Sequence, residues 1–237
     1  MTTKTFVVCC AICFSLVTSL PAQAQTATPN IPLPIARPDR PKPTPTPQRA
    51  NSVTYQAACP VVMDGRAIGK ISPPLQDNSC GTQSPYVITG VKSLGRTITL
   101  SSPVIFNCSM ATAFVEWVGE LDKQVEIKTN STLAKINVGT SYACRRRNNE
   151  KTGKISEHGF ANALDLTGFE LENGEQIELP TAWTDPGTAQ TLIKTAHKLA
   201  CQNFTTVLGP DANPLHFDHL HLDMGCHGKT CTYLICE

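Results

Sequence analysis

The stretch that decides the fold is Asn107-Cys-Ser-Met-Ala-Thr-Ala-Phe-Val-Glu-Trp-Val-Gly-Glu-Leu-Asp122. Its apolar residues fall at the positions i, i+3, i+4, i+7, i+8 and i+11, and they are Met110, Ala113, Phe114, Trp117, Val118 and Leu121. This spacing is the strongest helical signal in the chain. It predicts a helix that buries one face against a hydrophobic core.

A second helix is predicted from about residue 186 to 202, with Asp185 as its N-cap and Pro186 at its first helical position. Short runs rich in β-branched residues predict strands at residues 86–91, 97–100, 134–138, 163–170, 205–208 and 215–223. Helices and strands do not alternate regularly along the chain. We therefore expect an α+β fold, in which helices flank a small antiparallel sheet, rather than a doubly wound parallel fold.

The composition excludes several classes of protein. The 237 residues suffice for one domain and a tail, and 41% hydrophobic with 16% charged residues excludes a globally disordered chain. The 20 basic and 19 acidic side chains nearly cancel, so the charge balance does not support a nucleic-acid partner.

Residues 1–24 have the pattern of a secretory signal peptide. Lys4 precedes an apolar run from Phe6 to Leu20, and Ala22-Gln-Ala24 follows as a cleavage site. The run is too short to span a bilayer comfortably, and no later stretch is long enough. We expect cleavage, no membrane span in the mature protein, and a periplasmic or secreted location.

Residues 25–54 are expected to form a proline-rich basic linker ahead of a domain at residues 55–237. Eight prolines lie between Thr26 and Ser52, where four basic residues face one acidic residue. Such a segment favours an extended, solvated conformation. It could lie on an anionic wall polymer, but we expect a soluble tether.

The cysteines indicate disulfides. Three of the 11 cysteines lie within the signal, which leaves an even number in an exported chain. No C-x-x-C pair is present, and the spacings match no zinc finger. We expect Cys144 to pair with Cys201, and Cys59 with Cys80.

Three of the six histidines crowd into His216-Phe-Asp-His219-Leu-His221. On a strand, side-chain alternation would place His219 and His221 on one face, in line with Asp223. Two such imidazoles can converge on a metal ion, although a solvated strand that happens to carry histidines is an open alternative. His197 and His227, outside this cluster, are expected at the surface.

A second histidine motif lies in Ser156-Glu-His158-Gly-Phe-Ala-Asn-Ala-Leu-Asp165. Asp165 stands among apolar residues, where a carboxylate is costly to bury without a cation, a metal ion or several donors. Its spacing of seven from His158 does not fit one helix face, so we expect a loop carrying His158 to fold back over the strand carrying Asp165.

These motifs together resemble the bacterial extensin-like C-terminal domain family. The chain is also similar to the zinc peptidases that cleave D-alanyl bonds in peptidoglycan and to the penicillin-insensitive murein endopeptidases, which share a fold with the hedgehog signalling domain. The stretches that carry the resemblance are S-x-H-x(6)-D at residues 156–165, H-x-x-H-x-H at residues 216–221, Ser141-Tyr-Ala-Cys-Arg145, Leu208-Gly-Pro-Asp211, and Cys80-Gly81 with Cys108.

The resemblance implies a hedgehog/DD-peptidase-like fold and one zinc ion held by His158, Asp165 and His221, with a fourth position left for water. One departure is Ala161, where the peptidase pattern usually has glycine.

For catalysis the resemblance implies four further residues. His219 would be a general base or would orient the water, and His216 would be a second catalytic histidine. Asp218 occupies the position at which another branch of these zinc peptidases has a carboxylate base, and Arg145 would hold substrate oxygens.

Two functions follow from this comparison. The first is a zinc-dependent cell-wall peptidase, expected to be monomeric, that cleaves D-amino-acid-containing peptide bonds in peptidoglycan or its stem peptides. The second is a non-catalytic wall-binding or structural module whose zinc ion only stabilises the fold. Both predict one zinc ion per chain.

Overall fold

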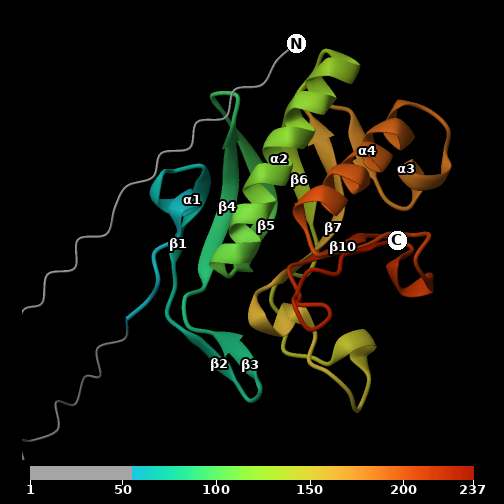
Figure 1. Cartoon of the computed structure of the whole chain (residues 1–237). Helices are drawn as coiled ribbons and strands as arrows, with labels where there is room; N and C mark the ends of the chain where they lie inside the picture. Colours follow the sequence, from blue (N-terminus) through green and yellow to red (C-terminus); the bar gives the residue numbers. More distant parts are fainter. Residues whose placement is uncertain (1–54) are drawn as a thin grey trace, which may run out of the picture. The chain divides into compact units, whose positions relative to one another are not determined.

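A nine-stranded sheet forms the centre of the fold in the computed structural model, which describes residues 55–237 (Figure 1). Its order is β1-β4-β5-β6-β7-β10-β9-β11, and β8 also pairs with β7. The strands are β1 (Ala67–Ile71), β4 (Tyr86–Ser93), β5 (Arg96–Phe106), β6 (Leu133–Val138), β7 (Ala163–Leu171), β8 (Gln176–Glu178), β9 (Thr206–Leu208), β10 (Leu220–Asp223) and β11 (Ile235–Cys236). A separate hairpin pairs β2 (Leu75–Asp77) with β3 (Cys80–Thr82).

The α+β class is confirmed, but the expectation of a small antiparallel sheet is wrong. The sheet is large and mixed, because β5 pairs with β6, and β9 with β11, in parallel. The first parallel pair follows from the connection between its strands. Helix α2 (Cys108–Thr129) crosses from the end of β5 to the start of β6, as parallel neighbours require.

Helix α2 and helix α4 (Thr188–Asn203) cover one face of the sheet (Figure 1). The predicted apolar stripe of α2 is buried, and Trp117 donates its indole N–H to the carbonyl of Ala196 in α4 at 3.0 Å. The Asn107 side chain caps α2 by accepting the N–H of Met110 at 2.9 Å. The remaining helical segments are α1 (Pro60–Met63), α3 (Thr181–Thr184) and the 3-10 turns η1 (Arg147–Asn149), η2 (Glu157–Phe160) and η3 (Pro214–His216).

The start predicted for the second long helix is wrong by two residues. Asp185 ends α3, since its backbone N–H donates to the carbonyl of Thr181 at 3.0 Å, and it does not cap α4. Gly187, at a positive φ of 152°, separates the two helices.

The strand predicted at residues 215–223 is wrong in its first half. Asn213 accepts the backbone N–H of Leu215 with its side chain at 3.0 Å, and Pro214 fixes the turn η3, so that only Leu220–Asp223 forms β10. His219 therefore precedes the strand that carries His221.

Four disulfides confirm the expected role of the cysteines, but both proposed pairings are wrong. The observed pairs are Cys59–Cys108, Cys80–Cys144, Cys201–Cys236 and Cys226–Cys231. Cys201 in α4 pairs with Cys236 in β11 across a Cα distance of 5.6 Å, and so it is not available to Cys144.

The expected signal peptide (residues 1–24) and linker (residues 25–54) lie outside the described residues. Between residues 55 and 237, no helix has the length and apolar character needed to cross a membrane.

Candidate metal centre

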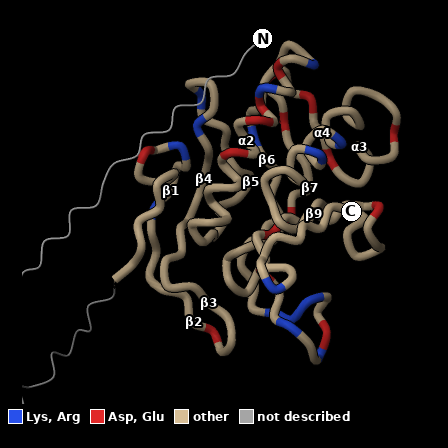
Figure 2. Tube along the Cα trace, viewed as in Figure 1, with Lys and Arg blue, Asp and Glu red and all other residues tan. Residues whose placement is uncertain are grey.

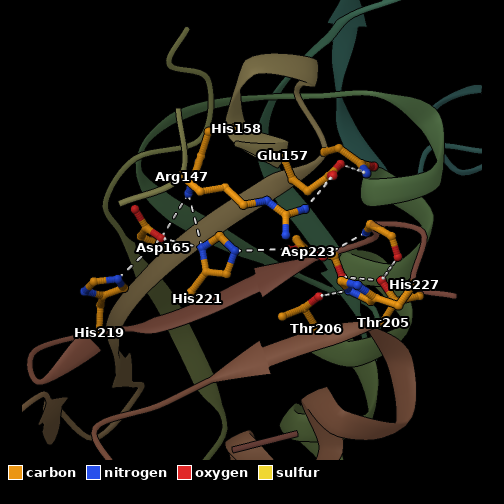
Figure 3. A network of polar contacts seen from close by, with 12 residues as sticks. Arg147, Glu157, His158, Asp165, Thr205, Thr206, His219, His221, Asp223 and His227 are labelled. Carbon is orange, nitrogen blue, oxygen red and sulfur yellow. Dashed lines mark hydrogen bonds and ion pairs between the residues drawn. The ribbon is translucent and has the colours of Figure 1, made fainter. Parts of the chain in front are cut away.

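Three predicted ligands meet beside the paired strands β7 and β10, although they come from three different elements (Figure 3). Asp165 in β7 and His221 in β10 are direct partners in the antiparallel pairing of these strands. His158 lies in η2, on the loop that returns to the start of β7, and is completely buried. The donor atoms are close together: Oδ1 of Asp165 lies 3.2 Å from Nε2 of His158 and 3.1 Å from Nδ1 of His221.

Outer hydrogen bonds fix which ring nitrogens face this meeting point. Nδ1 of His158 donates to the carbonyl of Ser141 at 3.0 Å, and Nε2 of His221 donates to the carboxylate of Asp223 at 3.1 Å. In the neutral tautomers, Nε2 of His158 and Nδ1 of His221 therefore direct lone pairs toward Asp165. Histidine ligands of metal ions commonly have such outer partners.

The close contact between these groups shifts the pKa values of Asp165 and His221 in opposite directions. For Asp165, burial acts to raise the pKa, but hydrogen bonds from His158 and His221 outweigh burial and hold the pKa far below its usual range. For His221, burial acts to lower the pKa, but Asp165 and Asp223 together raise it to about 9. The cluster thus attracts positive charge strongly.

The three donor atoms fit a divalent ion of zinc's size. Nε2 of His158 and Nδ1 of His221 are themselves 3.2 Å apart, so the atoms form a nearly equilateral triangle. Ligands about 2.0–2.1 Å from a tetrahedral zinc ion are about 3.3 Å from one another, close to the observed separations. Two imidazoles and one carboxylate are also a ligand set that zinc accepts.

An open pocket of about 330 Å³ gives access to this cluster. Asp165 and His221 contribute to its walls, whereas His158 does not. The other lining residues are Arg145, Arg147, Asn148, Asn149, Ser156, Glu157, Thr206, Leu208, Leu215, His216, His219, Asp223, His227 and Ile235.

His219 lies beside the cluster with a fixed orientation. Its Nε2 is 3.6 Å from Oδ1 of Asp165, and its Nδ1 donates to Asp218 at 2.9 Å. Nε2 is therefore the proton-accepting atom of the neutral ring. Asp218 is exposed and is not among the pocket residues, so its direct contact in the site is with His219.

His216 forms a buried part of the pocket wall. Asn213 accepts the N–H of Leu215 and also faces Nδ1 of His216 at 2.9 Å through the same side-chain oxygen. Nδ1 must therefore donate, which leaves Nε2 without a proton in the neutral ring. Burial, followed by the charge of His219, lowers the pKa of His216 to about 4, so this ring is neutral at neutral pH.

Arg145 lines the pocket as predicted, and its carbonyl accepts the N–H of Ser156 at 2.9 Å. Arg147 also lines the pocket and lies 3.5 Å from the carboxylate of Glu157, a feature that the sequence analysis missed. In the sequence, the arginine run at residues 145–147 and the position of Glu157 next to His158 indicate this ion pair.

Two hydrogen-bond partners of the ligand histidines, Asp223 and the carbonyl of Ser141, are also not evident as such from the sequence. The sequence predicts Asp223 in line with His221, but it does not indicate that the Asp223 carboxylate accepts a hydrogen bond from Nε2 of His221. The alternation of H-x-D on one strand face was the signal. Ser141 contributes a backbone carbonyl, which no residue-type pattern could reveal.

The two histidines expected at the surface are both partly buried. His227 lines the pocket and hydrogen-bonds Thr206 at 2.6 Å, whereas His197 packs edge-on against Trp183. His197 also lies near Cys201 and Cys236, but these two sulfurs form a disulfide and offer no thiolate.

Comparison with known proteins places the chain within a family. Neither the curated proteins nor the solved structures contain a significant match to it. The family described as "Extensin-like protein C-terminus" matches residues 57–236, which is most of the chain and includes every residue of the candidate centre. The chain therefore belongs to the extensin-like protein C-terminus family.

Proposed function

We propose that the protein is a zinc-dependent peptidase that hydrolyses D-amino-acid-containing peptide bonds of peptidoglycan. The observation that carries this proposal is the triangle of donor atoms of His158, Asp165 and His221, of which Asp165 and His221 line an open pocket. A cluster that served only to stabilise the fold would not need an adjoining cavity. The proposal includes a relationship to the zinc D-alanyl-D-alanine peptidases and to the hedgehog/DD-peptidase fold.

One zinc ion per chain is the proposed cofactor, with His158, Asp165 and His221 as its ligands. When bound, zinc supplies a Lewis acid for a carbonyl oxygen and lowers the pKa of a water molecule toward about 7. The hydrogen bonds from His158 to Ser141 and from His221 to Asp223 keep the two rings in the tautomers that ligation requires.

His219 is assigned the role of proton acceptor. Its Nε2 faces the site and accepts the proton that is released as water attacks the peptide carbonyl. Asp218 acts through His219, because it holds the proton on Nδ1 and stabilises the imidazolium that forms.

The substrate is held by the pocket walls. His216 presents an unprotonated Nε2 and can accept a hydrogen bond from a substrate N–H. The guanidinium of Arg145 is suited to carbonyl or carboxylate oxygens of a stem peptide. Four disulfides suit an oxidising compartment, and we propose that the protein acts as a monomer in the periplasm or outside the cell.

The test is release of soluble muropeptides from purified peptidoglycan, followed by chromatography. The zinc-loaded wild type should release fragments, and His219→Ala should abolish release while it retains zinc. His197→Gln is the matched control, because it changes a partly buried imidazole outside the pocket, and it should retain activity. If the zinc-loaded wild type releases no fragments from any peptidoglycan chemotype, the non-catalytic wall-binding module replaces the enzyme.

A further inference from the structure

Residues 145–155, called here the basic hairpin, differ in charge from the rest of the domain. They contain five basic residues and one acidic residue, whereas the other residues from 53 to 237 contain ten basic and 17 acidic residues. Figure 2 shows this segment as a group of blue stretches at the lower right. A strongly positive element on a negative body creates a local field that attracts anions.

The hairpin is held in a defined shape by its own backbone. Arg146 and Ile155 form an antiparallel bridge, and the N–H of Arg147 donates to the carbonyl of Lys154 at 3.1 Å. The N–H of Ser156 donates to the carbonyl of Arg145 at 2.9 Å, which closes the base of the hairpin. The charges are thus presented from an ordered element rather than from a free chain.

Most of these cations have no anionic partner within the domain. Among residues 55–237, only Arg147 of the hairpin has a carboxylate within ion-pair distance, namely Glu157 at 3.5 Å. Within the described residues 55–237, the two arginines outside the hairpin, Arg66 and Arg96, are both paired with carboxylates. Arg145, Lys151 and Lys154 are therefore available to an external anion, whereas Arg147 is paired with Glu157 and Arg146 donates to the carbonyl of Gly153.

The hairpin is also continuous with the candidate site. Arg145, Arg147, Asn148 and Asn149 form part of the pocket wall, while Lys151 and Lys154 are exposed beyond the pocket. A polymer with repeated negative charges could contact the exposed lysines and reach the pocket at the same time. Carboxylates match the arginines especially well, because a guanidinium binds them through two parallel hydrogen bonds.

We infer that the basic hairpin is the docking surface for the carboxylate-bearing peptides of a polymeric wall substrate. Contacts along residues 145–155 hold the polymer while one peptide enters the pocket. The inference rests on the proposed function for the identity of the polymer, but binding can be measured without turnover.

The experiment compares two double variants of the purified protein in co-sedimentation with insoluble peptidoglycan. Lys151→Glu/Lys154→Glu alters the hairpin, and Lys123→Glu/Lys198→Glu makes the same change in net charge at exposed positions of α2 and α4. We expect the hairpin variant to bind about tenfold more weakly and the helix variant to bind as the wild type does. Wild-type binding should also weaken as salt is raised.

A second arm uses peptidoglycan whose carboxylates have been converted to amides, and wild-type binding to it should be lost. The inference is overturned if the hairpin variant binds like the wild type, if both variants weaken equally, or if the amidated polymer is bound as well as the untreated one. Equal or tighter binding to double-stranded DNA would also overturn it, because phosphate rather than carboxylate would then be the preferred anion. If the protein binds peptidoglycan through the basic hairpin but releases no fragments, the proposed hydrolysis is wrong and the docking surface still stands.

Discussion

Asp223→Asn is the substitution that most sharply tests the outer shell of the metal centre. The two carboxylate oxygens of Asp223 accept from different donors, Nε2–H of His221 at 3.1 Å and the backbone N–H of Gly225 at 2.8 Å. An amide of the same shape has one oxygen and one NH₂ group, so it can satisfy only one of these donors. With the oxygen on Gly225, the NH₂ group faces Nε2 of His221. In the neutral ring, which is the form that binds a metal ion, the proton must then sit on Nδ1, the atom that faces Asp165.

The expected loss is in metal affinity. Removing an outer partner of a histidine ligand typically costs about 10- to 100-fold in affinity, or about 1.4–2.8 kcal/mol. We expect Asp223→Asn near the upper end of this range, because His221 loses a charged acceptor and also has to change tautomer. The assay is competition for zinc with a chromophoric chelator at neutral pH.

Asp218→Asn is the matched control, because it makes the same change beside His219, which is not one of the three converging ligands. Its zinc affinity should stay within about twofold of the wild type. Thermal unfolding of each variant with chelator present separates weaker binding from a folding defect. If folded Asp223→Asn binds zinc as tightly as the wild type, the assigned tautomer of His221 is wrong.

Three further predictions concern the loop around the ligands and the charge of the cluster. Gly159→Ala should lower the free energy of unfolding in urea by about 1–3 kcal/mol and weaken zinc binding, because its Cβ would lie 2.8 Å from Sγ of Cys80. Gly119→Ala, on a helix position with no neighbour within 4 Å, should instead be neutral or stabilising, and equal effects of the two changes would contradict the packing argument. Replacing both Cys80 and Cys144 by alanine should cost about 4 kcal/mol of stability, given their separation of 64 residues, and an unchanged denaturation midpoint would refute this estimate. Because metal binding must displace the proton that His221 holds below a pKa of about 9, zinc affinity should rise about tenfold per pH unit from neutral pH to about 9 and then level off. Calorimetry in buffers of different protonation enthalpy should show about one proton released at neutral pH, and a result of no release would be inconsistent with a proton on His221.

Helix α2 was predictable because its apolar stripe is long and regular, and tertiary packing agrees with it. Strand β7 was predictable from its apolar residues, which are all buried, namely Ala163, Leu164, Leu166, Phe169 and Leu171. The size of the sheet was not predictable, because β1 and β11 are short edge strands whose pairing depends on contacts distant in sequence.

The site was predictable as a set of residues but not as a geometry. Asp165 stood out as a carboxylate in an apolar strand, and the three C-terminal histidines stood out by their density. The route of His219 into the site could not be foreseen, because the turn at Asn213 and Pro214 replaces half of the predicted strand. Three of the four disulfide pairs were not predictable, because their sulfurs, 35 to 64 residues apart in sequence, are brought together only by the completed fold.

Elemental analysis of the purified protein after zinc loading and dialysis is the decisive measurement for a zinc centre at His158, Asp165 and His221. We expect about one zinc ion per wild-type chain and almost none in His158→Ala, although that variant should still show the far-ultraviolet circular dichroism of an α+β fold. A wild-type chain that retains no zinc, or a His158→Ala chain that retains as much as the wild type, would contradict this expectation.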